Sequence, residues 1–173
     1  PKVNSPTRSD NKFYQIATES KVLPAREEID QEYKWNLTDI FKSDEDWESE
    51  FKSVTEKVPG YQKFEGKLAE SAEFLLACFK FDEDINIKLD QLHLYAMLSK
   101  DSDMRVGKYH SMDDRIQSLY SKVGAASSFI RPELLKIPDE KLRGIIDSNK
   151  DLKIYKQSID DLLRSKKHTL SNN

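Results

Sequence analysis

The sequence lacks several features that define other classes of protein. It has a single cysteine, Cys78, so no intramolecular disulfide can form. Its 5 glycines and 6 prolines are too few for a collagen-like or low-complexity chain of 173 residues. The longest apolar run covers only residues 74–79, whereas a membrane span needs about 20 residues. The net charge of −3 argues against a broad basic surface for phosphates. We therefore expect neither a membrane nor a nucleic acid as a partner.

The composition is that of a helical protein with wide solvated faces. Charged residues make up 34% of the chain and hydrophobic residues 37%, and the mean hydropathy is −0.74. A chain of this length corresponds to about one domain and can bury roughly 70% of its unfolded surface. We find no strand-like alternation and no internal repeat. The predicted fold class is all-α, a helical bundle with a long antiparallel helical hairpin and shorter C-terminal helices.

The N-terminal part is expected to differ from the rest. Residues 1–22 are polar and show no sustained periodicity, so we expect a flexible leader that is tied down at most through Phe13, Tyr14 and Ile16. Residues 23–173 are expected to form one helical domain. At its beginning we expect an apolar cluster that docks onto the helices, formed by Trp35, Leu37, Ile40 and Phe41.

Helical spacing begins after residue 43. Ser43 precedes three acidic residues, which is the pattern of an N-terminal cap with a negative first turn. Apolar residues then follow at spacings of 4, 3 and 4, namely Trp47, Phe51, Val54 and Val58. Pro59 and Gly60 predict the end of this first helix.

Two longer helices are predicted next. Ser71 is a plausible cap for a helix that continues to about Lys100, and a third helix is predicted from near Met104 to about Ser128. Each has roughly 25 residues, which corresponds to nearly 40 Å. A short polar turn joins them, so we predict a long antiparallel hairpin.

Shorter helices are predicted in the C-terminal part. Pro132 and Pro138 should interrupt the helical pattern. A short helix is expected over residues 139–146. A last helix is expected to carry Leu152, Tyr155, Ile159 and Leu162 or Leu163, and to end in the basic run RSKKH.

The residues alone give no catalytic site. The three histidines, His93, His110 and His168, lie 17 and 58 residues apart, so the zinc-peptidase motif H-E-x-x-H is absent. Asp90 and His93 share a helix face, which we interpret as a surface pair, with half of a metal site as the minor alternative. Cys78 is expected to be a small buried hydrophobic residue. The many carboxylates are expected on solvated faces. We predict no catalytic, cofactor-binding or metal-binding residues in this chain.

Five segments together carry a resemblance to a known family. In order along the chain they are LPAREEIDQEYKWNLTDIF, FEGKL, LDQLHLYAMLSKDSD, SSFIRPELLKIPDEKL and LKIYKQSIDDLLRSKKHTLS. Their order and spacing resemble the N-terminal region of oligoendopeptidase F, over about 149 of the 173 residues.

The resemblance implies a zinc metallopeptidase as the parent protein. Oligoendopeptidase F is similar to thimet oligopeptidase, in which two helical regions enclose a deep channel. The implied zinc ligands and catalytic residues lie downstream of this sequence, so no catalytic or metal residue is carried over. The chain is then a non-catalytic N-terminal domain that forms one wall of the channel. Its implied partners are the missing C-terminal catalytic domain and an oligopeptide substrate, and the implied location is the cytoplasm.

Two other readings stay open. The first is a free-standing helical interaction module without enzymatic activity. The second is a carboxylate-rich metal protein. A channel domain separated from its catalytic half should expose an apolar face and could dimerise through it, which distinguishes it from the free-standing module.

Overall fold

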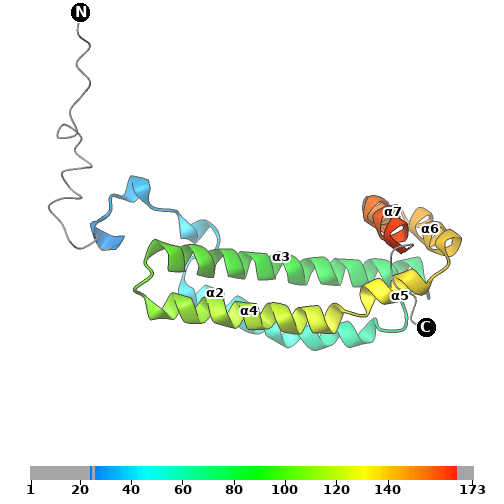
Figure 1. Ribbon diagram of the computed structural model, residues 1–173, viewed down its shortest axis with the longest axis horizontal. Coiled ribbons are helices and arrows are strands. Elements are labelled where there is room, and N and C mark those ends of the chain that lie inside the picture. Colours follow the sequence, from blue (N-terminus) through cyan, green and yellow to red (C-terminus); the bar gives the residue numbers. More distant parts are fainter. Residues whose placement is uncertain (1–23, 25, 167–173) are drawn as a thin grey trace, which may run out of the picture. The chain divides into compact units, whose positions relative to one another are not determined.

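The computed structural model describes residue 24 and residues 26–166, and it divides the chain into two units, residues 1–36 and residues 37–173. The described residues form α-helices and 3₁₀-helices without a strand, which confirms the all-α class (Figure 1). None of the described helices is long and apolar enough to cross a membrane. The predicted leader over residues 1–22 lies outside the described residues, with its anchors Phe13, Tyr14 and Ile16.

The first unit contains two short 3₁₀-helices, η2 (Arg26–Glu28) and η3 (Gln31–Tyr33). Trp35 follows them and is 55% exposed. Leu37, Ile40 and Phe41 belong to the second unit, where η4 (Leu37–Asp39) lies, and they pack against one of its cores, so this part of the predicted apolar cluster is confirmed. The docking of Trp35 stays a prediction.

Helix α2 (Asp44–Lys57) begins where the sequence predicts. The Ser43 hydroxyl accepts a hydrogen bond from the backbone N–H of Asp46 at 3.2 Å, and the acidic first turn faces the positive end of the helix dipole. Trp47 and Val54 are fully buried. The helix gives way at residue 58 to η5 (Val58–Lys63), which contains the predicted breaker Pro59.

The predicted hairpin consists of α3 (Ala72–Ser102) and α4 (Gly107–Ser127), which lie side by side (Figure 1). Ser71 caps α3 by accepting from the N–H of Phe74 at 3.1 Å. Helix α4 begins three residues later than predicted. The reason is local, because the Asp103 side chain accepts from the N–H of Arg105, and its carbonyl accepts from the N–H of Val106. This turn keeps residues 103–106 out of the helix.

The C-terminal part contains α5 (Ile130–Lys136), α6 (Asp139–Ser148), η6 (Leu152–Tyr155) and α7 (Lys156–Ser165). The helical pattern is interrupted in the predicted segment, but at residues 128–129, between α4 and α5, and not at Pro132 itself. Pro132 is the third residue of α5, and a proline is tolerated there because the first N–H groups of a helix have no partner inside it. Pro138 does separate α5 from α6. The predicted last helix is divided, since residues 152–155 form η6 before α7.

Two hydrophobic cores share helix α3. The first core lies between α2, η5, α3 and α4, and it contains Trp47, whose indole N–H donates to the Leu92 carbonyl at 2.8 Å. The second core joins the beginning of α3 to α5, α6, η6 and α7, and it contains Leu75 and Cys78. Phe81 packs against both cores. Phe129 and Ile130 also pack against both, so the two cores are connected through a small group of shared apolar side chains.

We predict that Gly60→Ala destabilises the fold at this junction. A Cβ at Gly60 would lie 2.8 Å from Cζ of Phe81, so the ring would have to move in a packed environment. We expect unfolding in urea to show a loss of about 1–3 kcal/mol. Gly124→Ala in α4 is the control, because nothing lies within 4 Å of its Cβ position. That variant should gain about 0.5–1 kcal/mol from helix propensity. Equal stabilities for both variants would contradict the prediction.

Candidate functional site

The residues predicted as chemical candidates do not come together. Cys78 is buried, and burial raises the pKa of its thiol to about 12, so it is not a nucleophile. His110 lies near the end of the hairpin, where a ring nitrogen contacts the Met104 carbonyl at 2.9 Å. His93 lies in the middle of α3, and His168 is outside the described residues. Among the described residues, no three His, Cys, Asp or Glu side chains are grouped to hold a metal ion.

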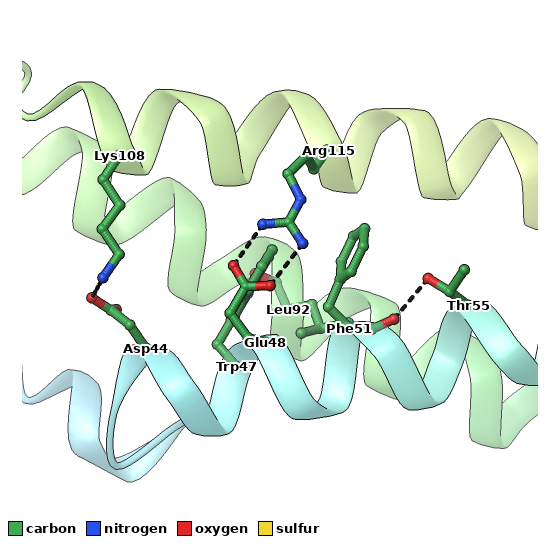
Figure 2. Close-up of polar contacts among 8 residues, drawn as sticks. All are labelled: Asp44, Trp47, Glu48, Phe51, Thr55, Leu92, Lys108 and Arg115. Atoms are coloured by element: carbon green, nitrogen blue, oxygen red, sulfur yellow. Dashed lines mark hydrogen bonds and ion pairs between the residues drawn. The ribbon is translucent and has the colours of Figure 1, made fainter.

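One face of the α3–α4 hairpin is covered by α2 (Figure 2). Arg115 of α4 donates two hydrogen bonds to the Glu48 carboxylate, at 2.5 and 2.7 Å. Lys108 of α4 pairs with Asp44 at 2.6 Å, near the beginning of α2. The Arg115 guanidinium also lies over the Phe51 ring, 4.4 Å from its centroid. These contacts fix α2 on the hairpin, so we assign this face a structural role.

On the side of the α3–α4 contact away from α2 lies a row of polar residues, which we call the polar seam. It consists of Asp90, His93 and Lys100 from α3, and Asp113 and Tyr120 from α4. The Tyr120 hydroxyl donates to Asp90 at 2.7 Å, and Lys100 donates to Asp113 at 2.5 Å. His93 lies between them, with its ring edge-on to the ring of Tyr120. The seam is our candidate site, because it brings charged and polar groups of α3 and α4 together in one row.

The seam changes the interpretation of two predicted features. Asp90 and His93 do lie near each other on α3, but each is engaged with α4 rather than forming a surface pair. Asp113 was expected on a solvated face, yet its side chain is only 17% exposed. The signal that sequence reasoning missed is the hairpin register. A turn at residues 103–106 places residue 93 near residue 120 and residue 100 near residue 113.

One contact in the seam is incomplete. Nδ1 of His93 and Oδ1 of Asp113 are buried and have no hydrogen-bond partner, although they face each other at 3.6 Å. A shift of about 0.7 Å would bring them to hydrogen-bond distance. With a proton on Nδ1 of His93, the contact would become a charge-assisted hydrogen bond.

Two of the five segments used for the family resemblance meet in the structure. The Glu133 carboxylate in FIRPELL accepts from the N–H of Gly66 at 2.9 Å and from the N–H of Leu68 at 2.7 Å, both in FEGKL. Gly66 has a φ of +79°, a conformation in which a side chain would be strained. A surface pocket of about 520 Å³ lies beside this contact and includes Glu65, Lys136 and Lys141. The two segments thus form one structural unit, held together by the Glu133 carboxylate.

Comparison with known proteins points to one family. A family model described as Oligopeptidase F matches residues 133–173. The oligopeptidase PepF of Bacillus subtilis is 35% identical over 158 residues, which are 90% of this chain. The plasmid-encoded oligoendopeptidase F of Lactococcus lactis is 32% identical over 84% of the chain. The chain belongs to the oligoendopeptidase F family. The crystal structure of oligoendopeptidase F from Enterococcus faecium matches it with a TM-score of 0.67 and 26% identity over 75% of the chain.

The match covers only part of the relatives. The chain spans 24% of the Bacillus subtilis and Lactococcus lactis proteins, and 26% of the Enterococcus faecium structure. It therefore corresponds to about a quarter of a family member, the N-terminal region. The prediction that this region contains no catalytic, cofactor-binding or metal-binding residue stays a prediction.

We predict that Glu133→Gln loosens the contact between FEGKL and α5. An amide cannot replace a carboxylate that accepts two backbone N–H groups, because one of its ends donates. We expect a loss of about 1–3 kcal/mol in urea unfolding. Glu140→Gln in α6 is the matched control, since Glu140 is exposed and has no such role. A Glu133 variant as stable as the control would contradict the prediction.

We also predict that most tyrosines of the second unit resist deprotonation. Burial and a hydrogen bond to a carboxylate raise the pKa of Tyr61, Tyr95 and Tyr120 above the usual range, and raise the pKa of Tyr155 to about 12. A pKa raised by folding adds stability below the unfolded value of about 10, and this stability is lost as the pH rises through the folded value.

The measurement is the absorbance of tyrosinate between pH 9 and 13, together with circular dichroism. We expect these four tyrosines to ionise above pH 11 and stability to fall over the same range. Tyr120→Phe should remove one of the late-ionising groups. Ionisation of all tyrosines near pH 10 in a folded protein would contradict the prediction.

Proposed function

We propose that this chain is the non-catalytic N-terminal domain of a zinc-dependent oligoendopeptidase and forms one wall of its substrate channel. The observation that carries the proposal is the match to about a quarter of proteins named oligopeptidase or oligoendopeptidase F. On this proposal, residues 23–173 form the domain and the catalytic part follows in the parent chain. The substrate is a short peptide, and the enzyme acts in the cytoplasm.

The zinc of such an enzyme does not fit the residues at hand. The described part of the chain offers no set of metal ligands, and the sequence contains no H-E-x-x-H. Zinc in the parent would polarise the scissile carbonyl and activate water. We assign this chain no part in that step. Its contribution is to hold the substrate and to limit its size.

The hairpin suits the role of a channel wall. Helix α3 has 31 residues and is therefore about 46 Å long, and α4 packs along it. Two packed helices fixed by α2 form a surface that bends little, so a channel beside them would stay narrow. A narrow channel admits short flexible peptides and excludes folded proteins. We propose that the polar seam faces this channel and supplies hydrogen-bonding groups to the peptide.

The first test of the proposal is activity. We expect the chain alone to cleave no quenched fluorescent peptide and to hold no stoichiometric zinc by metal analysis. The full-length protein should cleave the peptide and lose this activity with a chelator. Cleavage by the chain alone that a chelator abolishes would contradict the proposal. A full-length protein without peptidase activity would favour the helical interaction module instead.

The second test locates the peptide. A peptide inhibitor with a photoreactive group is bound to the full-length protein, irradiated and mapped by mass spectrometry. We expect labels on the seam side of α3 and α4, near His93 and Tyr120. The α2 side, near Arg115, is the internal control and should stay unlabelled. Labels confined to the catalytic half would contradict the role of a channel wall.

A further inference from the structure

The exposed apolar residues of the second unit are concentrated in one region. Its large exposed hydrophobic side chains are Ile87, Leu94, Met104, Val106 and Ile154, with exposed fractions of 59%, 42%, 69%, 37% and 72%. The first four lie on the second half of α3 and on the turn that follows it. We call these four residues the outer stripe. Ile154 lies apart, in η6.

Helical geometry places Ile87 and Leu94 of the outer stripe opposite the core. Ile87 and Leu94 are seven residues apart, so they lie on one face of α3 about 10 Å from each other. The buried residues of the same stretch, Leu89, Leu92 and Ala96, lie on the other side of the helix. A surface helix normally has polar residues opposite its core. Helix α3 therefore has more apolar surface than the second unit buries.

Helix α4 shows the usual pattern and serves as a comparison within the same hairpin. Its core residues are Met112, Ile116, Leu119 and Val123. The exposed positions between them are polar, namely Asp114, Gln117, Ser118 and Ser121. The apolar outer surface is thus specific to α3 and to the turn. Asp90 and Gln91 lie on the same face of α3 between Ile87 and Leu94, so this surface mixes apolar and polar side chains, as protein interfaces do.

We infer that the outer stripe is the surface on which the rest of the oligoendopeptidase polypeptide packs; this inference rests on the proposed function. The curated relatives are about four times as long as the matched region, so a large part of the polypeptide is tethered to this domain. A tethered partner has a high effective concentration, and a small apolar patch is enough to dock it.

A second copy of this chain is the weaker candidate for the same surface. Four partly exposed aliphatic side chains offer on the order of a few hundred Å² of apolar area. A stable dimer buries about 800 Å² per partner and must also offset the loss of translational and rotational freedom. The outer stripe is too small for that, but it is large enough for contact within one polypeptide.

On this inference, the outer stripe and the polar seam of α3 have different roles. Leu94 belongs to the outer stripe, while the preceding residue, His93, belongs to the polar seam. Asp90 lies between Ile87 and Leu94, so docking through the outer stripe would cover this residue and leave His93, Lys100 and Asp113 of the seam beside the docked surface. The seam would then line the gap between this domain and the rest of the enzyme, where the proposed channel lies.

The test compares this chain with the full-length protein by hydroxyl-radical labelling and mass spectrometry. In this chain at concentrations where it is monomeric, we expect strong labelling of Met104, Leu94, Ile87 and Ile154. In the full-length protein, the outer stripe should lose most of its labelling. Ile154 is the control, because it is equally exposed in this chain but lies outside the stripe, and it should stay labelled.

Two variants make the test independent of labelling. Ile87→Gln and Leu94→Gln replace apolar side chains of the outer stripe with polar ones and should change the melting temperature of this chain little, because neither residue belongs to its cores and Gln is a good helix former. In the full-length protein, each should lower the melting temperature clearly. Ile154→Gln is the matched control and should have little effect in either protein.

Each outcome decides the inference. Full labelling of the stripe in the full-length protein, or protection of Ile154 to the same degree, would overturn it. If the outer stripe is already protected in the monomeric chain, another part of this chain covers it. If the stripe is protected only when this chain dimerises, a second copy covers it. Either result would also overturn the inference. Peptidase activity is measured on the same samples. An active full-length protein with an unprotected stripe contradicts this inference alone, whereas an inactive one contradicts the proposed function.

Discussion

Helix α3 contributes residues to two hydrophobic cores, and the other helices of the second unit pack around it to form these cores. Its first residues pack with α5, α6 and α7, and its later residues pack with α2 and α4. Phe81 stands at the change from one core to the other. Because the helix is continuous, its rotation about its own axis is set jointly by both cores. A change in the packing of one core is therefore transmitted to the other through α3 and not through a flexible connection.

Hydrogen bonds also connect α3 to the segments around it. Four tyrosine hydroxyls donate to carboxylates, and α3 contributes one partner to each pair: Tyr61 with Asp82, Tyr155 with Glu83, Tyr120 with Asp90, and Tyr95 with Asp44. A phenol places a rigid apolar ring at the edge of a core and a hydrogen bond at the surface. Each pair therefore adds a ring to the edge of a core, and its hydrogen bond fixes the position of a neighbouring segment along the axis of α3. The acidic run at residues 82–84, which the sequence suggests is only a solvated face, serves as an anchor for two of these segments.

Local signals predicted much of this fold. The caps at Ser43 and Ser71, the apolar spacing of α2 and the short turn between two long helices depend on neighbours in the chain, and the structure has them where expected. The features that the sequence does not predict depend on contacts between residues far apart in the chain, or on the exact position of a residue within its helix. Pro132 correctly predicts an interruption of the helical pattern, but the interruption lies at residues 128–129, since a proline fits in the first turn of α5. Asp113 was placed in solvent because its partners, Lys100 and His93, come from the opposite helix. A pattern along one helix carries no information on the register of two helices.

The candidate site depends even more on the register of the two helices, which the sequence does not reveal. Sequence reasoning singled out Asp90 and His93, but the seam also needs Lys100, Asp113 and Tyr120, which only the hairpin register brings to it. The outer stripe could not be found from periodicity either, because Ile87 and Leu94 look like additional core positions in a helix that is apolar on several sides. Their exposure becomes visible only when the positions of α2 and α4 are known. A group of exposed apolar side chains on one side of a helix can mark a surface that another part of a protein covers. The presence of such residues on α3, and their absence from α4, is explained most simply if α3 is covered by polypeptide outside this unit. The helix that organises both cores would then also transmit the position of the rest of the enzyme to the seam, since His93 and Leu94 are consecutive residues of one rigid helix.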